Sequence, residues 1–343
     1  MTGFSTKVIR WQKLHGRHDL PWQNTRDAYR IWLSEIMLQQ TQVATVIPYY
    51  QRFLQRFPDI KSLAAAPLDD VLAVWSGLGY YSRARNLHRA AQAVHAEHHG
   101  RFPGEFEAVL ALPGIGRSTA AAICVFAFGA RHAVLDGNVK RVFARCFGIA
   151  GYPGKAKTAS RLWRAAEQQL PRRNVEAYIQ GLMDLGAAVC VRGKPRCGDC
   201  PVAHDCVARR RGTIGRLPVP RPRKSLPQRG TQMLVLLHAG QVLLEKRPTH
   251  GIWGGLWSLP EAAPDADVAA LCAQRYGAEI ATRAALPPVA HGFTHFRLDI
   301  EPHLLGVERV MPRAAAPGVI WLPLNEALGA AIPAPVRRIL ARL

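Results

Sequence analysis

Through the first 210 residues, apolar positions recur at the spacing of one helix face, and short Gly or Pro breaks separate the runs. Few stretches alternate apolar and polar residues as a half-buried strand does. The pattern predicts helices over residues 26–42 (ending before Pro48), 117–128 (stopped by Gly129), 139–147 and 177–190. We therefore expect a mainly helical region, with the 117–128 helix, which is apolar on nearly every side, in its core.

The pattern changes after residue 208. Between residues 209 and 230 prolines alternate with basic residues, and proline at that density favours an extended linker over a helix. Beyond it, strand-like runs at 232–237 and 241–245 flank His238-Ala239-Gly240, a hairpin signal, and a helix is expected near 268–276. A length of 343 residues suits two or three domains. We divide the chain into a helical region (1–211), a basic Pro-rich linker (212–230) and a small α+β domain (231–343).

The charge of the chain indicates a partner. Lys and Arg number 45 against 24 Asp and Glu, a formal net charge of +21, and residues 1–230 carry +20 of it. Such a surface attracts polyanions, most commonly nucleic acid, although a GC-rich genome that favours Arg and Ala codons would give a similar composition. No apolar run reaches the roughly 18 to 20 residues of a membrane span, and residues 1–18 lack the apolar core of a signal peptide. We therefore expect a cytoplasmic protein with no membrane partner.

The seven cysteines fall into two groups. Cys124, Cys146 and Cys272 are solitary among apolar neighbours, where a thiol usually behaves as a small hydrophobic group. The other four form a C-x6-C-x2-C-x5-C cluster that predicts a metal site: Cys190, Cys197, Cys200 and Cys206. Zinc sites usually show two close pairs joined by a longer arm, so this compact spacing favours a [4Fe–4S] cluster over zinc.

Two glycine loops are candidates for DNA contact. Leu112-Pro113-Gly114-Ile115-Gly116 lies between two predicted helices, where Gly114 and Gly116 let the backbone approach a phosphate at a helix N-terminus. This resembles the hairpin of a helix-hairpin-helix motif, and a simple interhelical turn is the alternative. The second loop, Gly77-Leu78-Gly79-Tyr80-Tyr81, is followed by Arg83 and Arg85 and offers aromatic rings for a base stack.

Two carboxyl groups are candidates for catalysis. Glu35 lies among apolar residues of the 26–42 helix, so loss of hydration should raise its pKa towards the range of a proton donor. Asp136 precedes the 139–147 helix, where a carboxylate stays ionised and oriented. A buried Glu–Arg pair and a simple N-cap are the structural alternatives. One acid and one carboxylate are what cleavage of a glycosidic bond requires, and in DNA the base must first be flipped out of the duplex.

With these residues assembled, the chain resembles the adenine DNA glycosylases, A/G-specific helix-hairpin-helix enzymes with an iron–sulfur cluster. The likeness covers nearly the whole length. It rests on Leu20-Pro21-Trp22, WLSEIMLQQTQVATVIPYY (32–50), GLGYYSRARNL (77–87), LPGIGRSTA (112–120), LDGNVKRV (135–142), the four cysteines and WGGLWSLP (253–260). The resemblance implies a mainly α glycosylase fold, made of a six-helix domain and an iron–sulfur helical domain, followed by a C-terminal α+β Nudix-like domain. It also implies base excision repair of adenine mispaired with 8-oxoguanine or guanine.

The resemblance assigns roles to matching positions. Glu35 would protonate adenine at N7 and later activate water, Asp136 would stabilise or bond to the sugar cation, and Asn138 would position water and carboxylate. The remaining assignments are the adenine pocket (Leu20, Trp22, Gln180), the residues that enter the duplex beside 8-oxoguanine (Gln40, Tyr80), the 8-oxoguanine-sensing loop (Phe293-Thr294-His295), the phosphate hairpin (Gly114, Gly116) and the cluster ligands (Cys190, Cys197, Cys200, Cys206). Relatives more often have Ser than Thr294, and the added methyl group is a departure.

Two features set the reaction type. Ser118 stands where strand-cutting relatives carry the Schiff-base lysine, and a serine cannot form an imine, so we expect a monofunctional glycosylase. Residues 261–277 lack the paired acidic residues of a Nudix box, so the last domain should bind nucleotides without hydrolysing triphosphates. The chain is expected to act as a monomer on duplex DNA, associated with the nucleoid if bacterial, with repair proteins possible at the linker.

Two other functions stay open. An endonuclease-III-like glycosylase/lyase acting on oxidised pyrimidines would share the hairpin, Asp136 and the cluster, but it would need lysine at position 118. A non-catalytic iron–sulfur DNA-binding protein would give Glu35 no role.

Overall fold

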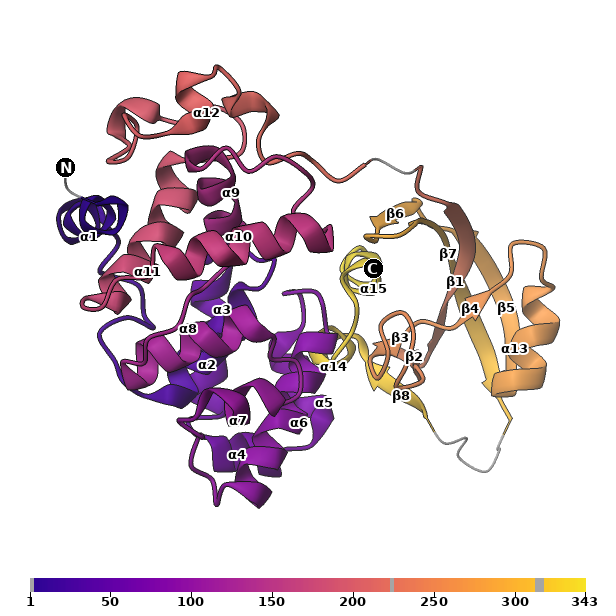
Figure 1. Cartoon of the computed structure of the whole chain (residues 1–343). Helices are drawn as coiled ribbons and strands as arrows, with labels where there is room; N and C mark the ends of the chain where they lie inside the picture. Colours follow the sequence, from indigo (N-terminus) through magenta and orange to yellow (C-terminus); the bar gives the residue numbers. More distant parts are fainter. Residues whose placement is uncertain (1–2, 223–224, 312–317) are drawn as a thin grey trace. The chain divides into compact units, whose positions relative to one another are not determined.

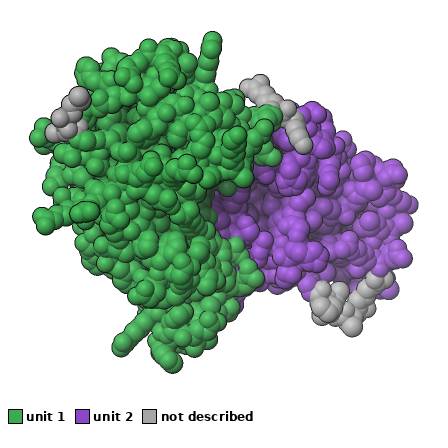
Figure 2. Space-filling view, in the orientation of Figure 1, with its two compact units in different colours: residues 1–65, 86–223 green, residues 66–85, 224–343 purple. Residues whose placement is uncertain are grey.

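The computed structural model describes residues 3–222, 225–311 and 318–343. The chain forms two compact units, one of residues 1–65 and 86–223 and the other of residues 66–85 and 224–343 (Figure 2). The predicted linker therefore ends the first unit and begins the second, and its residues Arg223 and Lys224 lie outside the described residues. The inclusion of residues 66–85 in the second unit has no counterpart in the sequence pattern.

The described residues of the first unit form helices joined by loops and contain no strand (Figure 1). Its α-helices are α1 (Phe4–His15), α2 (Ala28–Leu38), α3 (Val43–Arg56), α4 (Ile60–Ala65), α7 (Phe106–Ala111), α8 (Arg117–Phe128), α9 (Gly137–Cys146), α10 (Ala156–Gln168), α11 (Val175–Asp184) and α12 (Val207–Arg210). Three short turns complete it: a π-helical turn (Leu185–Val189) and 3-10 turns at Cys197–Asp199 and Ile214–Arg216. Helix α6 (Ser82–Glu97) begins in the second unit and continues into the first.

The expected helices of the first unit are present, and all but one have shifted ends. α8 has the predicted bounds, and Gly129 ends it in the left-handed conformation that favours glycine. α2 is shorter than predicted, because the Asp27 side chain caps its start and the chain turns after Leu38. As predicted, α2 ends before Pro48, and Pro48 lies inside the next helix, α3. The predicted 177–190 helix is α11 followed by the π-helical turn, which leads directly to Cys190.

The core of the first unit forms where α8, α9 and α11 meet. α8 contributes small residues such as Ala121 and Ala122, which let the neighbouring helices approach closely. Phe143 of α9 and Tyr178 of α11 are fully buried against them. The apolar sequence of α8 is thus explained by the burial of residues 120–125 and Ala127.

The second unit contains a mixed sheet with strand order β3-β2-β1-β7-β5. Its strands are β1 (Gln228–His238), β2 (Gln241–Lys246), β3 (Trp257–Ser258), β4 (Glu261–Ala262), β5 (Ala278–Ala285), β6 (Val289–Gly292), β7 (Arg297–Val310) and β8 (Val319–Pro323). Its helices are α5 (Leu68–Trp75), α13 (Val268–Tyr276), α14 (Leu324–Gly329) and α15 (Ala334–Leu340). The predicted hairpin joins β1 and β2, with Ala239 and Gly240 both at positive φ.

Residues 66–85 are bound into this unit by specific contacts. The Ser76 hydroxyl donates to the backbone oxygen of Ile332 at 2.9 Å, and Arg85 donates to the backbone oxygen of Gly254 at 2.6 Å. Asp69 forms an ion pair with Lys246. The C-terminal unit is therefore completed by a segment from the first third of the chain. None of the helices in the described parts combines the length and apolar character needed to cross a lipid bilayer.

Candidate active site

A pocket of about 470 Å³ in the first unit brings three of the sequence candidates together. Glu35 of α2, Trp22 of the preceding loop and Gln180 of α11 all line it. Leu20 does not line it, but the Leu20 backbone nitrogen donates to Oε1 of Gln23, a lining residue, at 3.1 Å. Its lining combines the Trp22 indole with polar side chains such as those of Gln23 and Gln180.

The surroundings of Glu35 favour its protonated form. It lies on α2 between the buried residues Ser34 and Ile36, and its carboxyl group is at the pocket wall. Burial, together with the negative charge of Asp136, raises the pKa of Glu35 to about 8. The rise in pKa that the apolar neighbours indicated is therefore present, and a second carboxylate contributes to it.

Asp136 caps the start of α9. Its Oδ1 accepts from the backbone nitrogen of Val139 at 2.7 Å, and the Asn138 amide donates to its Oδ2 at 3.3 Å. Burial raises the pKa of Asp136, while the backbone donors and the charges of Arg141 and Lys140 oppose the rise. The sequence predicted that the helix start would keep Asp136 ionised, whereas the net direction is a raised pKa, because burial outweighs the donors and positive charges that oppose it.

Arg141 is a site residue that the sequence reasoning missed. Its guanidinium donates to Oδ1 of Asn138 at 2.8 Å, to the backbone oxygen of Gly186 at 2.6 Å and to that of Cys190 at 2.7 Å. It thus ties Asn138, which holds Asp136, to the chain that enters the cysteine cluster. The sequence signal was weak, because an Arg in the first turns of a helix usually faces solvent.

Gly186 is a second missed residue. A Cβ atom at this position would lie 2.5 Å from Cβ of Asn138, which is closer than real Cβ contacts. The π-helical turn therefore passes against Asn138 only because position 186 is glycine.

Ser118 and the hairpin glycines Gly114 and Gly116 have local structural roles. The Ser118 hydroxyl accepts from the backbone nitrogen of Leu135 at 3.1 Å and so holds the residue next to Asp136. Gly114 has φ of +79°, and a Cβ there would lie 2.6 Å from Cβ of Asn86. Gly116 is exposed with open space in front of it, directly before the first residue of α8. The hairpin thus presents bare backbone at a helix N-terminus.

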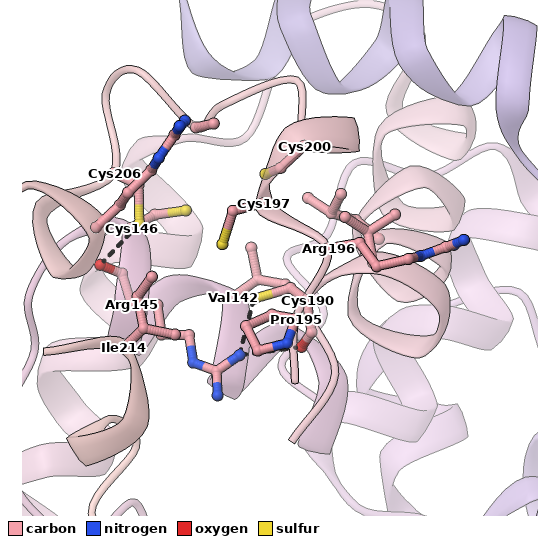
Figure 3. A pocket seen from close by; sticks show the side chains of 14 residues that line it. Val142, Arg145, Cys146, Cys190, Pro195, Arg196, Cys197, Cys200, Cys206 and Ile214 are labelled. Carbon is pink, nitrogen blue, oxygen red and sulfur yellow. Dashed lines mark hydrogen bonds between the residues drawn. The ribbon is translucent and has the colours of Figure 1, made fainter. Parts of the chain in front are cut away.

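The four clustered cysteines surround one cavity in the first unit, and a fifth faces it with them (Figure 3). The fifth is Cys146 at the end of α9, which the sequence suggested was an inert hydrophobic residue. Its thiol is hydrogen-bonded to Cys206 and lowers the pKa of Cys206 to about 6, while its own pKa is raised. Among the described residues, no group of three or more His, Cys, Asp or Glu side chains has the geometry of a bound metal ion.

The charge around this cavity fits an anionic metal–thiolate group. Arg145 is only 3% exposed, and its guanidinium donates to Sγ of Cys190 at 3.4 Å and to the backbone oxygens of Val191 and Leu217, each at 2.8 Å. No acidic side chain in the described parts of the chain forms an ion pair with it. A buried cation needs a compensating charge, and the four cysteine sulfur atoms would supply it when they bind a metal as thiolates.

A second pocket, of about 580 Å³, lies entirely within the second unit. It is lined by Tyr80 and by Phe293, Thr294 and His295 of the loop between β6 and β7. The Phe293 ring contacts Trp253 at 5.4 Å and His291 at 4.7 Å between centroids. The sensing loop and Tyr80, which are far apart in the sequence, are therefore brought together.

Gln40 and Tyr80 share an unusual backbone conformation. Gln40, in the first unit, has φ of +58° and Tyr80, in the second, has φ of +50°. Both side chains are exposed, Tyr80 to 45%. Strained, exposed residues of this kind are concentrated at functional sites.

Comparisons with known proteins agree with this organisation. Residues 33–168 match the family described as HhH-GPD superfamily base excision DNA repair protein, and residues 232–342 match the NUDIX domain. The adenine DNA glycosylase of Buchnera aphidicola subsp. Acyrthosiphon pisum is 37% identical over 338 residues, which cover 98% of this chain and 96% of that protein. The human adenine DNA glycosylase is 33% identical, with 99% of this chain and 73% of the human protein covered.

Two solved structures resemble the helical part. A thermostable thymine-DNA glycosylase superposes with a TM-score of 0.56 at 31% identity and covers 61% of this chain and 95% of its own. A non-covalent endonuclease III–DNA complex gives a TM-score of 0.52 at 20% identity, with 61% and 94% covered, and shows the likeness in fold.

Proposed function

Because the chain belongs to the adenine DNA glycosylases, enzymes of base excision repair, we propose that it removes adenine opposite 8-oxoguanine in duplex DNA without cutting the strand. The observation that carries this proposal is the pocket in which Glu35, an acid with a pKa of about 8, lies with Trp22 and Gln180. A flipped adenine would enter this pocket.

The chemistry follows from the two carboxyl groups. Protonated Glu35 donates to N7 of adenine, which makes the base a better leaving group, and afterwards Glu35 serves as a base for water. The Asp136 carboxylate, fixed by Val139 and Asn138, stabilises the positive charge that develops on the sugar. Ser118 offers no amine for an imine, and for this reason we propose hydrolysis alone, rather than the lyase reaction of endonuclease-III-like enzymes.

Recognition of the opposite base is assigned to the second unit. Its 580 Å³ pocket presents stacking surfaces (Tyr80, Phe293) and hydrogen-bonding side chains (Thr294, His295), which suit an oxidised purine. Because residues 261–277 lack a Nudix box, we propose that this unit binds the damaged base and does not hydrolyse triphosphates. Gln40 would enter the duplex from the first unit, and Gly114 and Gly116 would bind backbone phosphate.

We assign Cys190, Cys197, Cys200 and Cys206 as ligands of a [4Fe–4S] cluster, with Arg145 as the buried countercharge. When bound, the group supplies metal–thiolate bonds that fix the 190–206 loop. Arg192, Lys194 and Arg196 in that loop would face DNA phosphate.

One experiment tests the proposal. Duplexes with adenine opposite 8-oxoguanine, G, C or T are incubated with the enzyme, and free base and strand breaks are scored before and after alkali. We expect adenine release to be fastest opposite 8-oxoguanine, then G, with strand breaks only after alkali. Equal release from all four duplexes, or breaks without alkali, would contradict the proposal.

A further inference from the structure

The amide of Gln180 is held by the buried Asp184, which forms an ion pair with the half-buried Arg17. One helical turn after Gln180, Asp184 is 1% exposed, and its Oδ1 accepts from Nε2 of Gln180 at 2.9 Å. The same carboxylate accepts from the backbone nitrogen of Arg17 at 3.0 Å and from its Nε at 2.7 Å, and Nη2 lies 2.6 Å away. Asp184 therefore has donors on both oxygens.

This arrangement determines which end of the Gln180 amide faces the carboxylate. A carboxylate paired with a guanidinium is an acceptor only, so the side facing Asp184 must be the NH₂ group. Turning the amide over would place Oε1 against Asp184, two acceptors in a buried place, which is costly. The carbonyl oxygen Oε1 is thereby left as the acceptor for the pocket that Gln180 lines.

Arg17 also orders the neighbouring wall of the pocket. Its backbone oxygen accepts from Nε2 of Gln23 at 3.0 Å, and Gln23 lines the same pocket. Arg17 and Asp184 thus lie behind the pocket wall, where they orient polar groups without lining the pocket themselves.

We infer that Asp184 and Arg17 are positioning residues that set base specificity, because they force Gln180 to present an acceptor beside the acid donor of Glu35. The Gln180 acceptor complements the N6–H₂ donor of adenine, and the Glu35 donor complements its N7 acceptor. Guanine and hypoxanthine present two acceptors, O6 and N7, and would leave O6 facing Oε1. This inference rests on the proposed function and adds the device that selects adenine within it.

The test compares adenine with hypoxanthine, each placed opposite 8-oxoguanine, in single-turnover release assays. For the wild type we expect adenine to be favoured by about tenfold or more. In Asp184→Asn the side chain at 184 offers both a donor and an acceptor, so Gln180 can bind in either orientation. The adenine-to-hypoxanthine ratio should then fall by about tenfold, and Arg17→Lys should lower it less.

Controls separate the possible outcomes. Asp59→Asn, at an exposed position that does not line the pocket, should leave the ratio unchanged. A fall in both rates with an unchanged ratio, or a wild-type ratio near one, would overturn the inference and leave Asp184 a structural residue. If Asp184→Asn does not fold, Arg17→Lys decides the matter.

A binding assay makes the test independent of cleavage. A 2′-fluorine on the target sugar prevents cleavage, and the affinities of such adenine and hypoxanthine duplexes should show the same dependence on Asp184. Failure of the wild type to release adenine would refute the proposed function, whereas loss of the predicted affinity difference would refute only this inference.

Discussion

The charge of Asp136 acts on Glu35 and helps burial to raise the pKa of Glu35 to about 8. The two carboxyl groups come from different helices, α2 and the start of α9. Glycosidic cleavage needs one carboxyl group that holds a proton and one that is ionised, and the charge of Asp136 acts in that sense because it favours the protonated form of Glu35.

Substitution Glu35→Gln should retain binding to an 8-oxoguanine:adenine duplex and lower adenine release by about 100-fold or more, because the amide cannot donate the proton. Single-turnover release and a gel-shift assay measure the two effects. Glu97→Gln, at an exposed position at the end of α6, is the matched control and should match the wild type. Unchanged release by Glu35→Gln would remove Glu35 from the mechanism.

The same pKa predicts two pH effects. Release should decline as pH rises through about 8, since the acid form is lost. The pKa of Glu35 in the folded protein lies above the ordinary value of 4.5. Protonated Glu35 therefore contributes its full stabilisation of the folded state below pH 4.5, and this stabilisation is lost as the pH rises through 8. Near pH 4 the free energy of unfolding of Glu35→Gln should therefore equal that of the wild type. At pH 8.5 the variant should be more stable than the wild type by up to a few kcal/mol, because one pKa unit corresponds to about 1.4 kcal/mol. Thermal unfolding at both pH values checks this, and equal stability at pH 8.5 would refute it.

The cysteine assignment predicts iron loss from specific variants. Cys190→Ser should purify with reduced iron content, weak visible absorbance and a lower Tm, because one ligand is missing. Cys124→Ser, a buried thiol outside the cavity, is the control and should retain iron. Cys146→Ala should also retain iron, since Cys146 is not assigned as a ligand. Iron loss from Cys146→Ala but not from Cys190→Ser would show that the ligand set is wrong.

Ser118 predicts the outcome of borohydride trapping. The wild type should give no efficient covalent complex with DNA, because no amine stands at position 118. Any weak trapping should disappear in Lys140→Ala, which removes the nearest lysine along the chain from Asp136. Ser118→Lys should trap more than the wild type, although it gives up the hydrogen bond from Leu135. Efficient trapping by the wild type would contradict a monofunctional enzyme.

The pocket of the second unit predicts a change in preference rather than in rate. Thr294→Ala and His295→Ala should lower the ratio of adenine release opposite 8-oxoguanine to that opposite guanine by several-fold, at about 1 kcal/mol for each lost hydrogen bond. Release opposite guanine should change little. Thr282→Ala, on β5 and outside the pocket, is the control. Equal losses on both duplexes would argue against a sensing role.

Point variants are preferable to deletion of residues 231–343, because that deletion would uncover the 66–85 segment.

The local sequence determined several elements of the fold and the order of the domains. The bounds of α8 followed from a continuous apolar run ended by Gly129, and the β1–β2 hairpin from its turn residues. The mainly α glycosylase fold with a C-terminal Nudix-like domain is confirmed by the family matches. These features depend on periodicity, turn chemistry and contiguous motifs, all of which can be read along the chain.

Tertiary structure alone decided which distant residues meet. It placed residues 66–85 in the C-terminal unit, Cys146 in the cysteine cavity, Arg141 between Asn138 and Cys190, and Asp184 behind Gln180. Each of these relations joins segments whose local pattern has an ordinary explanation, such as an apolar thiol or a polar residue on a helix. The roles arise from burial and from hydrogen-bond partners, and these exist only once the chain has folded.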